Sequence, residues 1–188
     1  MTVLRFISSN EDKISEYREL LQPFEFIPLQ LTIRETFSDD PRDVVREKLL
    51  KAYEMKRAPL FVDHTGLFIE ELGGMPGPFT HLFWNRMQAR GILGLLACKE
   101  HRRALARTTI GYCDGRRIYF FEGEMWGDVA REPAGNTSTW MCLFIPEGFD
   151  NTMAEMTLEQ KNSISHRRRA AEKFKQFLQN PGGAAYRV

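Results

Sequence analysis

The sequence is poor in cysteine and carries almost no net charge. Its 188 residues include three cysteines, Cys98, Cys113 and Cys142, and no two of them are close in sequence. An odd, widely spaced set predicts neither a disulfide framework nor a structural zinc site, and it indicates a reducing compartment. The formal charge of +1 gives no general attraction to nucleic acids or anionic membranes. We therefore expect a cytoplasmic protein that has no nucleic-acid partner.

Long apolar runs are also absent. No stretch is apolar over the length needed to cross a bilayer, and the opening residues MTVLRFISSN lack the pattern of a signal peptide. The sequence has no internal repeat and no low-complexity linker. Its 188 residues, 43% of them hydrophobic, suit one domain with a sizeable core. We expect a single domain over residues 1–188, with a loose tail at 181–188 and no membrane contact.

Apolar periodicity predicts helices and strands that interleave early, followed by strands that cluster late. Helices are expected from Asn10 as N-cap, from Asp40 and Pro41 to near Lys56, from Pro78, over 92–101, and from Ser165 to Leu178. Strands are expected at 2–8, 24–33, 59–72, 104–113, 116–130 and 139–146, and the strand at 59–72 is expected to break or bend at its polar centre. This order predicts an α/β fold with an elongated mixed sheet and flanking helices.

The segment SSNEDK, residues 8–13, joins the first expected strand to the first expected helix. The free N–H groups and the positive end of a helix form an anion site, and Lys13 in the first turn lies within reach of a phosphate. An ordinary capped helix with a surface lysine would have the same sequence. Both interpretations stay open on the residues alone.

The segment VDHTGL, residues 62–67, places two ionisable groups side by side. On a regular strand Asp63 and His64 point to opposite faces. Asp63 is a candidate ligand for Mg²⁺, which prefers carboxylate oxygen. His64 is a candidate general base, because its ordinary pKa lies near neutrality, or a hydrogen-bonded structural histidine.

The segment EQKNSISHRRRA, residues 159–170, opens the last expected helix. Ser165 is a suitable N-cap, and Lys161, His166 and Arg167 cluster near the positive helix end. Such a cluster suits an anion or the acceptor edge of a nucleobase.

Taken in order, these segments resemble the inosine triphosphate pyrophosphatase family over nearly the whole chain. SSNEDKISEYRELL resembles the family's opening T-G-N-x-x-K, LFVDHTGLFIEELGGMPGPF its acidic strand and Gly-Pro loop, and TMAEMTLEQKNSISHRRRA its S-H-R ending. The resemblance implies an elongated α/β homodimer in which two lobes surround a central nucleotide cleft. Such enzymes hydrolyse aberrant purine nucleoside triphosphates, such as dITP, ITP and XTP, to the monophosphate and pyrophosphate with Mg²⁺.

The resemblance also implies roles for individual residues. Phosphate contacts are expected from Ser8, Asn10, Lys13 and Lys48. Nucleotide contacts on the base side are expected from Trp140, Lys161, His166 and Arg167. Glu35 and Asp63 would serve the metal. An arginine at the purine oxygen favours inosine and xanthine over adenine, which carries a donor where hypoxanthine carries an acceptor.

The sequence departs from the family at the expected centre of catalysis. His64 stands where the family has a second acid, which is the expected catalytic base. The family's base-contact segment F-G-[WY]-D-P reads STWMCLF here, and Met141 replaces its aspartate. A carboxylate attracts a nearby Mg²⁺ ion, and one pair of unit charges ~4 Å apart near a protein surface is worth about 4 kcal/mol. Losing a general base reduces the reaction rate by a factor of roughly 10²–10⁴.

Two functions remain. In the first, the chain is a divergent, catalytically weakened member that senses a purine nucleoside triphosphate and signals to an effector protein. Kongming-type antiphage systems use a family member beside an NAD-degrading effector in this way. In the second, it is an active Mg²⁺-dependent pyrophosphatase in which His64 or a chain of water molecules acts as the base. A nucleic-acid module built on Arg167, Arg168 and Arg169 fits the net charge poorly.

Overall fold

The computed structural model describes residues 3–34 and 36–181 of the chain. The helices are α1 (Glu11–Leu20), α2 (Pro41–Lys56), α3 (Thr80–Leu95), α4 (Leu158–Ile164) and α5 (His166–Gln179), with 3-10 helices η1 (Glu70–Leu72) and η2 (Trp140–Leu143). The strands are β1 (Leu4–Ile7), β2 (Phe26–Leu29), β3 (Leu60–Ile69), β4 (Pro76–Gly77), β5 (Arg103–Cys113), β6 (Ile118–Val129) and β7 (Phe144–Pro146). No helix within these described ranges is both long and apolar enough to cross a bilayer.

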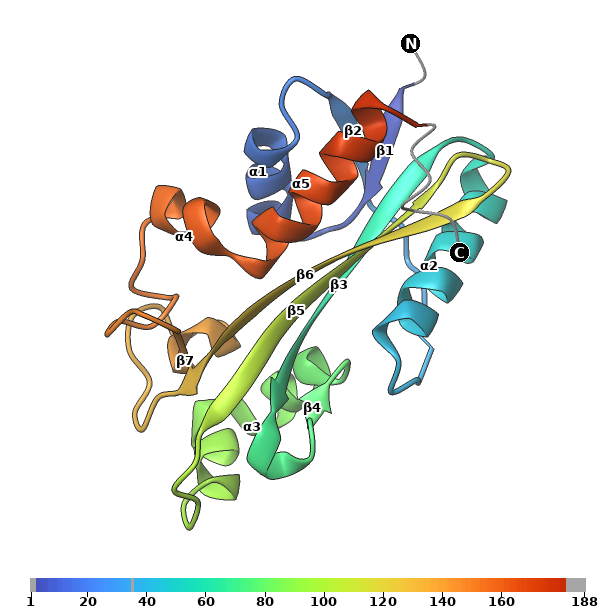
Figure 1. Ribbon diagram of the computed structural model, residues 1–188. Coiled ribbons are helices and arrows are strands. Elements are labelled where there is room, and N and C mark those ends of the chain that lie inside the picture. The colour runs from blue at the N-terminus through green and yellow to red at the C-terminus, as the bar shows by residue number, and fades with distance from the viewer. Residues whose placement is uncertain (1–2, 35, 182–188) are drawn as a thin grey trace.

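The strands form one seven-stranded mixed sheet in the order β2-β1-β3-β5-β6-β7, with β4 paired to β3. β1 runs parallel to β2 and to β3, whereas the pairs from β3 through β7 are antiparallel. At one end of the sheet, α1 and α5 pack on one face and α2 on the other (Figure 1). The predicted α/β fold with a mixed sheet and flanking helices is confirmed.

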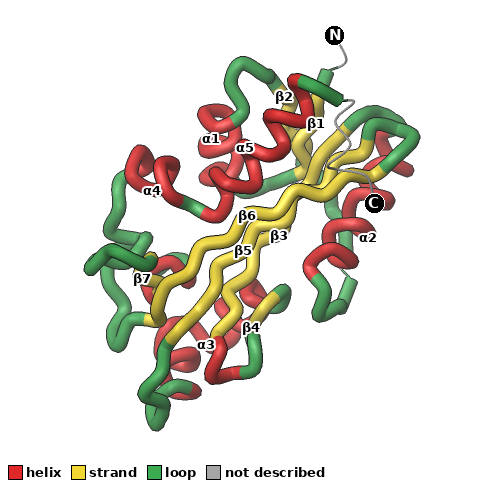
Figure 2. The backbone as a smooth tube through the Cα atoms, viewed as in Figure 1, coloured by secondary structure: helices red, strands yellow, loops and turns green. Residues whose placement is uncertain are grey.

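Three apolar clusters divide the molecule into two lobes that share the long strands β5 and β6 (Figure 2). In the first lobe, one cluster packs α1 and α5 on the sheet, and another packs α2 on the opposite face. In the second lobe, a cluster beneath α3 and η2 covers the other end of the strands. The two lobes therefore meet along the middle of β3, β5 and β6.

Three of the expected helix starts are confirmed, because each depends on a short-range side-chain cap. The side chain of Asn10 accepts from the N–H of Lys13, and the side chain of Asp40 accepts from that of Arg42, with Pro41 at the first helical position. The hydroxyl of Ser165 accepts from the backbone N–H of Arg168. These caps hold the starts of α1, α2 and α5 as the sequence predicts.

The strand expected at 59–72 does not break at its polar centre, so that part of the prediction is wrong. β3 is continuous, and each residue from Leu60 to Ile69 has a partner on β5. The long ladder overrides the local polar sequence, since the pairing with β5 runs without interruption through Asp63 and His64. Asp63 and His64 therefore point to opposite faces, as a regular strand requires.

Two other boundaries differ from the sequence prediction. The helices expected from Pro78 and over 92–101 are one helix, α3, which is kinked at Gln88 (φ 53°, ψ −170°) and ends at Leu95. The strand expected at 139–146 is half 3-10 helix, because η2 precedes the short strand β7. The loose tail was predicted on residues that, except for Pro181, lie outside the described ranges.

Candidate functional site

The middle of β3 lacks a strand partner on one edge. β1 pairs with β3 at Leu60 and Phe61, and β4 pairs with it at Leu67 and Phe68. Among the described strands, residues 62–66 pair with β5 alone. We call residues 62–66 the β3 notch. Ligands of open α/β sheets bind where a parallel strand ends and the chain leaves the sheet, and β1 ends beside this notch.

Asp63 lies in the notch and is 3% exposed. The ammonium of Lys13 donates to its Oδ1 at 2.8 Å, and the hydroxyl of Tyr17 donates to its Oδ2 at 3.4 Å. The Nε of Arg167 lies 3.7 Å from the same Oδ2. Burial by itself would raise the pKa of Asp63, but the charges of Lys13 and Arg167 outweigh it and leave the pKa below its ordinary value. The carboxylate is therefore ionised at neutral pH.

Arg167 joins a second buried carboxylate to this group. Its guanidinium forms an ion pair with Glu16, which is 6% exposed. Burial would lower the pKa of Arg167, but the charges of Glu16 and Asp63 raise it further above its usual range. Lys13, Asp63, Arg167 and Glu16 thus form a charge network in which two cations balance two anions. It links α1, β3 and α5.

The phosphate elbow predicted at 8–13 is built on two side-chain caps. The Ser8 hydroxyl accepts from the N–H of Asn10 at 3.2 Å, and Asn10 Oδ1 accepts from the N–H of Lys13 at 2.9 Å. Both side chains therefore shape the turn. Lys48 on α2 adds charge, since it lowers the pKa of both Lys13 and Asp63. The elbow and α2 together give this side of the notch a positive character.

His64 faces away from Asp63 and is 8% exposed. Its Nε2 lies 2.9 Å from the carbonyl oxygen of Pro78. A carbonyl only accepts, so Nε2 carries the proton and the basic lone pair is on Nδ1. The imidazole thereby ties β3 to the chain that follows the Gly-Pro turn. Its catalytic role stays a prediction.

His166 lies at the start of α5 and is 1% exposed. Neither ring nitrogen has a hydrogen-bond partner within the described part of the chain. Burial, followed by the charge of Arg167, lowers the pKa of His166 to about 3. The ring is therefore neutral at physiological pH and offers one donor and one acceptor. Trp140, half-buried, lies beside it with ring centroids 5.9 Å apart.

Gly123 of β6 allows the start of α5 to pack directly against the backbone of the sheet. A Cβ built on Gly123 of β6 would lie 2.0 Å from the backbone oxygen of His166. No side chain fits there without moving the helix start. Gly123 therefore helps to set the position of His166 and of Arg167 after it.

Two predicted residues are not joined to this group. Lys161 lies on α4 and is half-buried, and its ammonium has no ion pair with the residues that the structure describes. Glu35, the expected metal ligand, lies outside the described residues. The sequence analysis named neither Glu16 nor Tyr17 as a site residue. The signal for Glu16 was its position three residues after Lys13, which places both on one helix face.

The described donors do not by themselves fit a magnesium ion. They include no group of three or more His, Cys, Asp or Glu side chains that could hold a metal. Lys13, Tyr17 and Arg167 already engage the Asp63 carboxylate, and Mg²⁺ requires a nearly ideal octahedron of oxygens. The expected pair of Glu35 and Asp63 stays a prediction.

Comparison with known proteins gives a consistent result. A profile of the Ham1 family matches residues 4–177. A dITP/XTP pyrophosphatase of Thermococcus kodakarensis is 36% identical over 178 residues, covering 93% of this chain and 96% of the relative. Another, from Saccharolobus solfataricus, is 38% identical over 177 residues, covering 93% and 92%. The structure of a HAM1 protein from Coxiella burnetii superposes with a TM-score of 0.84 at 26% identity, covering 95% of this chain and 99% of the other.

Proposed function

The chain belongs to the Ham1 family, and on that premise we propose that it binds purine nucleoside triphosphates of the dITP, ITP and XTP type and turns them over slowly. The names of its relatives support the class of nucleotide. The β3 notch supports the site, because cations, a helix start and a buried imidazole lie around it. No membrane and no nucleic acid take part in this function.

In the proposed complex, the phosphates lie against the start of α1. Lys13 and Lys48 supply positive charge, and the helix start supplies backbone N–H groups. The ammonium of Lys13 forms a 2.8 Å ion pair with Asp63, and this pair fixes its position. A phosphate that binds here would contact the same ammonium. Such preorganisation lowers the cost of ordering the lysine side chain on binding.

The purine lies on the side of Trp140 and His166. A neutral imidazole at this position donates to the purine oxygen. Hypoxanthine and xanthine present an oxygen acceptor there, whereas adenine presents an amino donor. Arg167 adds positive charge beside the purine oxygen, although Glu16 and Asp63 also hold it.

The observation that carries slow turnover is the position of His64. His64 replaces the family's expected catalytic acid, and its Nε2 forms a 2.9 Å hydrogen bond with the carbonyl oxygen of Pro78. A neutral imidazole cannot supply the negative charge of a carboxylate. A general base is worth roughly 10²–10⁴ in rate, and we expect turnover to be reduced by a factor in that range.

The test combines binding and turnover on one preparation. Purified protein is incubated with dITP, ITP, XTP, dGTP or ATP plus Mg²⁺, and pyrophosphate release and thermal unfolding are both measured. We expect dITP to raise the unfolding temperature, since a ligand that binds only the folded state stabilises it, while pyrophosphate appears slowly. The absence of a shift with every nucleotide would reject nucleotide binding. Release at ordinary enzyme rates would reject the weakened site.

Slow turnover with retained binding suits a sensor. A bound nucleotide that persists can be reported to a partner, and we propose an effector protein as that partner, in the manner of Kongming-type antiphage systems. We also propose a homodimer, as the family resemblance implies. Sedimentation of the purified chain, alone and with dITP, measures the oligomeric state directly.

The alternative is an active pyrophosphatase. The specific observation in its favour is the Lys13–Asp63 pair, which keeps a charged carboxylate in the notch. In that case dITP would be converted to its monophosphate and pyrophosphate, with His64 or a chain of water molecules accepting a proton from the attacking water. The turnover assay separates the two functions.

A further inference from the structure

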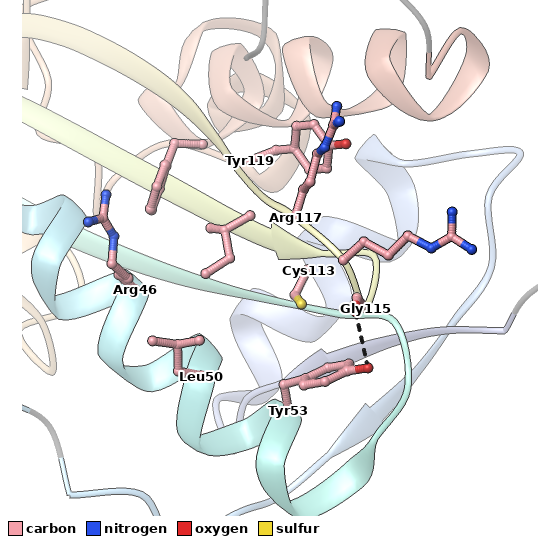
Figure 3. Close-up of a pocket in the computed structure, with 10 residues that line it drawn as sticks. Arg46, Leu50, Tyr53, Cys113, Gly115, Arg117 and Tyr119 are labelled. Atoms are coloured by element: carbon pink, nitrogen blue, oxygen red, sulfur yellow. Dashed lines mark hydrogen bonds between the residues drawn. The ribbon is translucent and has the colours of Figure 1, made fainter. Parts of the chain in front are cut away.

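A pocket of about 800 Å³ lies between α2 and the turn that joins β5 to β6 (Figure 3). We call it the hairpin pocket. It lies on the α2 face of the sheet, whereas Asp63, Arg167 and His166 of the nucleotide site lie on the α1 and α5 face. None of the residues that we place in the nucleotide site lines it. The pocket therefore needs an explanation of its own.

The floor of the hairpin pocket is apolar. Leu50 on α2 is 42% exposed, although leucine is usually buried on a helix that packs against a sheet. Beside it, Phe120 and Cys113 of the sheet are 8% and 6% exposed. Leu50 therefore presents an apolar side chain to water inside the pocket, and an apolar side chain of a partner would bury it.

The rim of the pocket is cationic. Arg46 comes from α2 and Arg116 from the hairpin turn. The side chain of Arg117, from the same turn, extends on the side of Tyr119, away from Leu50 (Figure 3). No acidic residue lines the pocket. Within the described part of the chain, none of the three guanidinium groups has an ion-pair partner. The guanidinium of Arg46 is held 5.5 Å from the centre of the Phe120 ring.

The one acidic residue in the turn is otherwise engaged. Asp114 Oδ1 accepts from the backbone N–H groups of Arg116 and Arg117, at 2.7 and 2.8 Å. Its Oδ2 accepts from the hydroxyl of Tyr119 at 3.3 Å. Asp114 thus shapes the turn and leaves both arginine side chains available to another molecule.

The walls of the pocket are preformed. The hydroxyl of Tyr53 on α2 donates to the carbonyl of Gly115 at 3.5 Å (Figure 3). Gly115 has φ +98°, and a Cβ on it would lie 3.0 Å from the Tyr53 hydroxyl. Helix and hairpin are therefore joined, and a ligand would not have to bring them together.

We propose that the hairpin pocket docks an acidic segment of a partner protein, which places one apolar side chain on Leu50 and carboxylates on the arginines. A guanidinium binds a carboxylate through two parallel hydrogen bonds, and arginine is enriched at protein interfaces. A small phosphorylated ligand fits less well, because it would use the arginines and leave the exposed Leu50 side chain uncovered. The proposal does not depend on nucleotide binding.

The test selects a phage-displayed library of random dodecapeptides on the immobilised full-length chain without nucleotide. We expect enriched peptides that are acidic, carry a large apolar residue and bind less tightly at high salt. The double variant Arg46→Glu with Leu50→Asp should weaken them by more than about tenfold, since it removes both the anchor and a cation. The matched control is Arg86→Glu with Leu82→Asp on α3, where Leu82 is 41% exposed, and it should bind as the parent does.

Three results would overturn the proposal. One is a selection that enriches no acidic peptide above the empty phage scaffold. A second is equal binding to the pocket variant and the parent, with both folded by circular dichroism. A third is displacement of the peptides by inorganic triphosphate at low millimolar concentration, together with triphosphate binding that the pocket variant loses and the α3 control keeps, which would assign the pocket to a phosphorylated small molecule. Thermal shift with dITP on the pocket variant tests the nucleotide site separately.

Discussion

Replacing His64 with aspartate should raise the rate of pyrophosphate release from dITP. The substitution restores a carboxylate at the position where the Ham1-like sequence pattern has its second acid. A general base contributes roughly 10²–10⁴ in rate, so the variant should gain a factor in that range if the rest of the site is competent. The lower end is expected if the altered contacts around Met141 also slow the reaction.

The same change costs stability. His64 is 8% exposed and donates to the Pro78 carbonyl at 2.9 Å, and aspartate has no donor for that oxygen when ionised. A buried acceptor without a partner costs about 1–3 kcal/mol, and the carboxylate is next to Asp63 in sequence. The free energy of unfolding of a small domain is about 5–15 kcal/mol, which is larger than this cost. We therefore expect the variant to fold and to unfold at a lower temperature.

The assay compares His64→Asp with His64→Asn. Asparagine matches aspartate in size, but it supplies neither charge nor a base. Pyrophosphate release from dITP is followed for both variants and the parent, and circular dichroism and the dITP-dependent thermal shift confirm folding and binding. Equal rates for the two folded, dITP-binding variants would refute the assignment of position 64 as the limiting one.

Three further predictions address the site around the notch. Gly123→Ala should lower the unfolding temperature and the dITP-dependent shift, because its Cβ would lie 2.0 Å from a backbone oxygen of α5, whereas Gly94→Ala, with nothing within 4 Å, should be neutral or stabilising. His166 has its pKa lowered to about 3 in the folded state. The unfolded chain therefore takes up a proton first as pH falls below about 6.5, so urea unfolding should show a loss on the order of 2 kcal/mol by pH 5 that His166→Gln removes. Lys13→Met should abolish most of the dITP-dependent thermal shift, whereas Arg18→Met on the same helix should retain it; retention in both would exclude Lys13 from phosphate binding.

The elements that the sequence predicted best are those with local determinants. The starts of α1, α2 and α5 were found because each N-cap bonds a backbone N–H only two or three residues away. The β5–β6 turn is likewise local, because Asp114 and Gly115 carry its geometry within four residues. The break predicted in β3 failed because pairing with β5, more than forty residues along the chain, decided that segment.

The sequence by itself determined the α/β class, the helix starts and the resemblance to a pyrophosphatase family, because local propensities, caps and motif order carry that information. It also predicted that Asp63 and His64 point apart, since alternate residues of a strand face opposite sides. Only the tertiary structure decided what each one meets. Asp63 gains Lys13 and Arg167, while His64 gains the Pro78 carbonyl. The partners of a buried charge come from segments far apart in sequence, and packing alone brings them within hydrogen-bond distance.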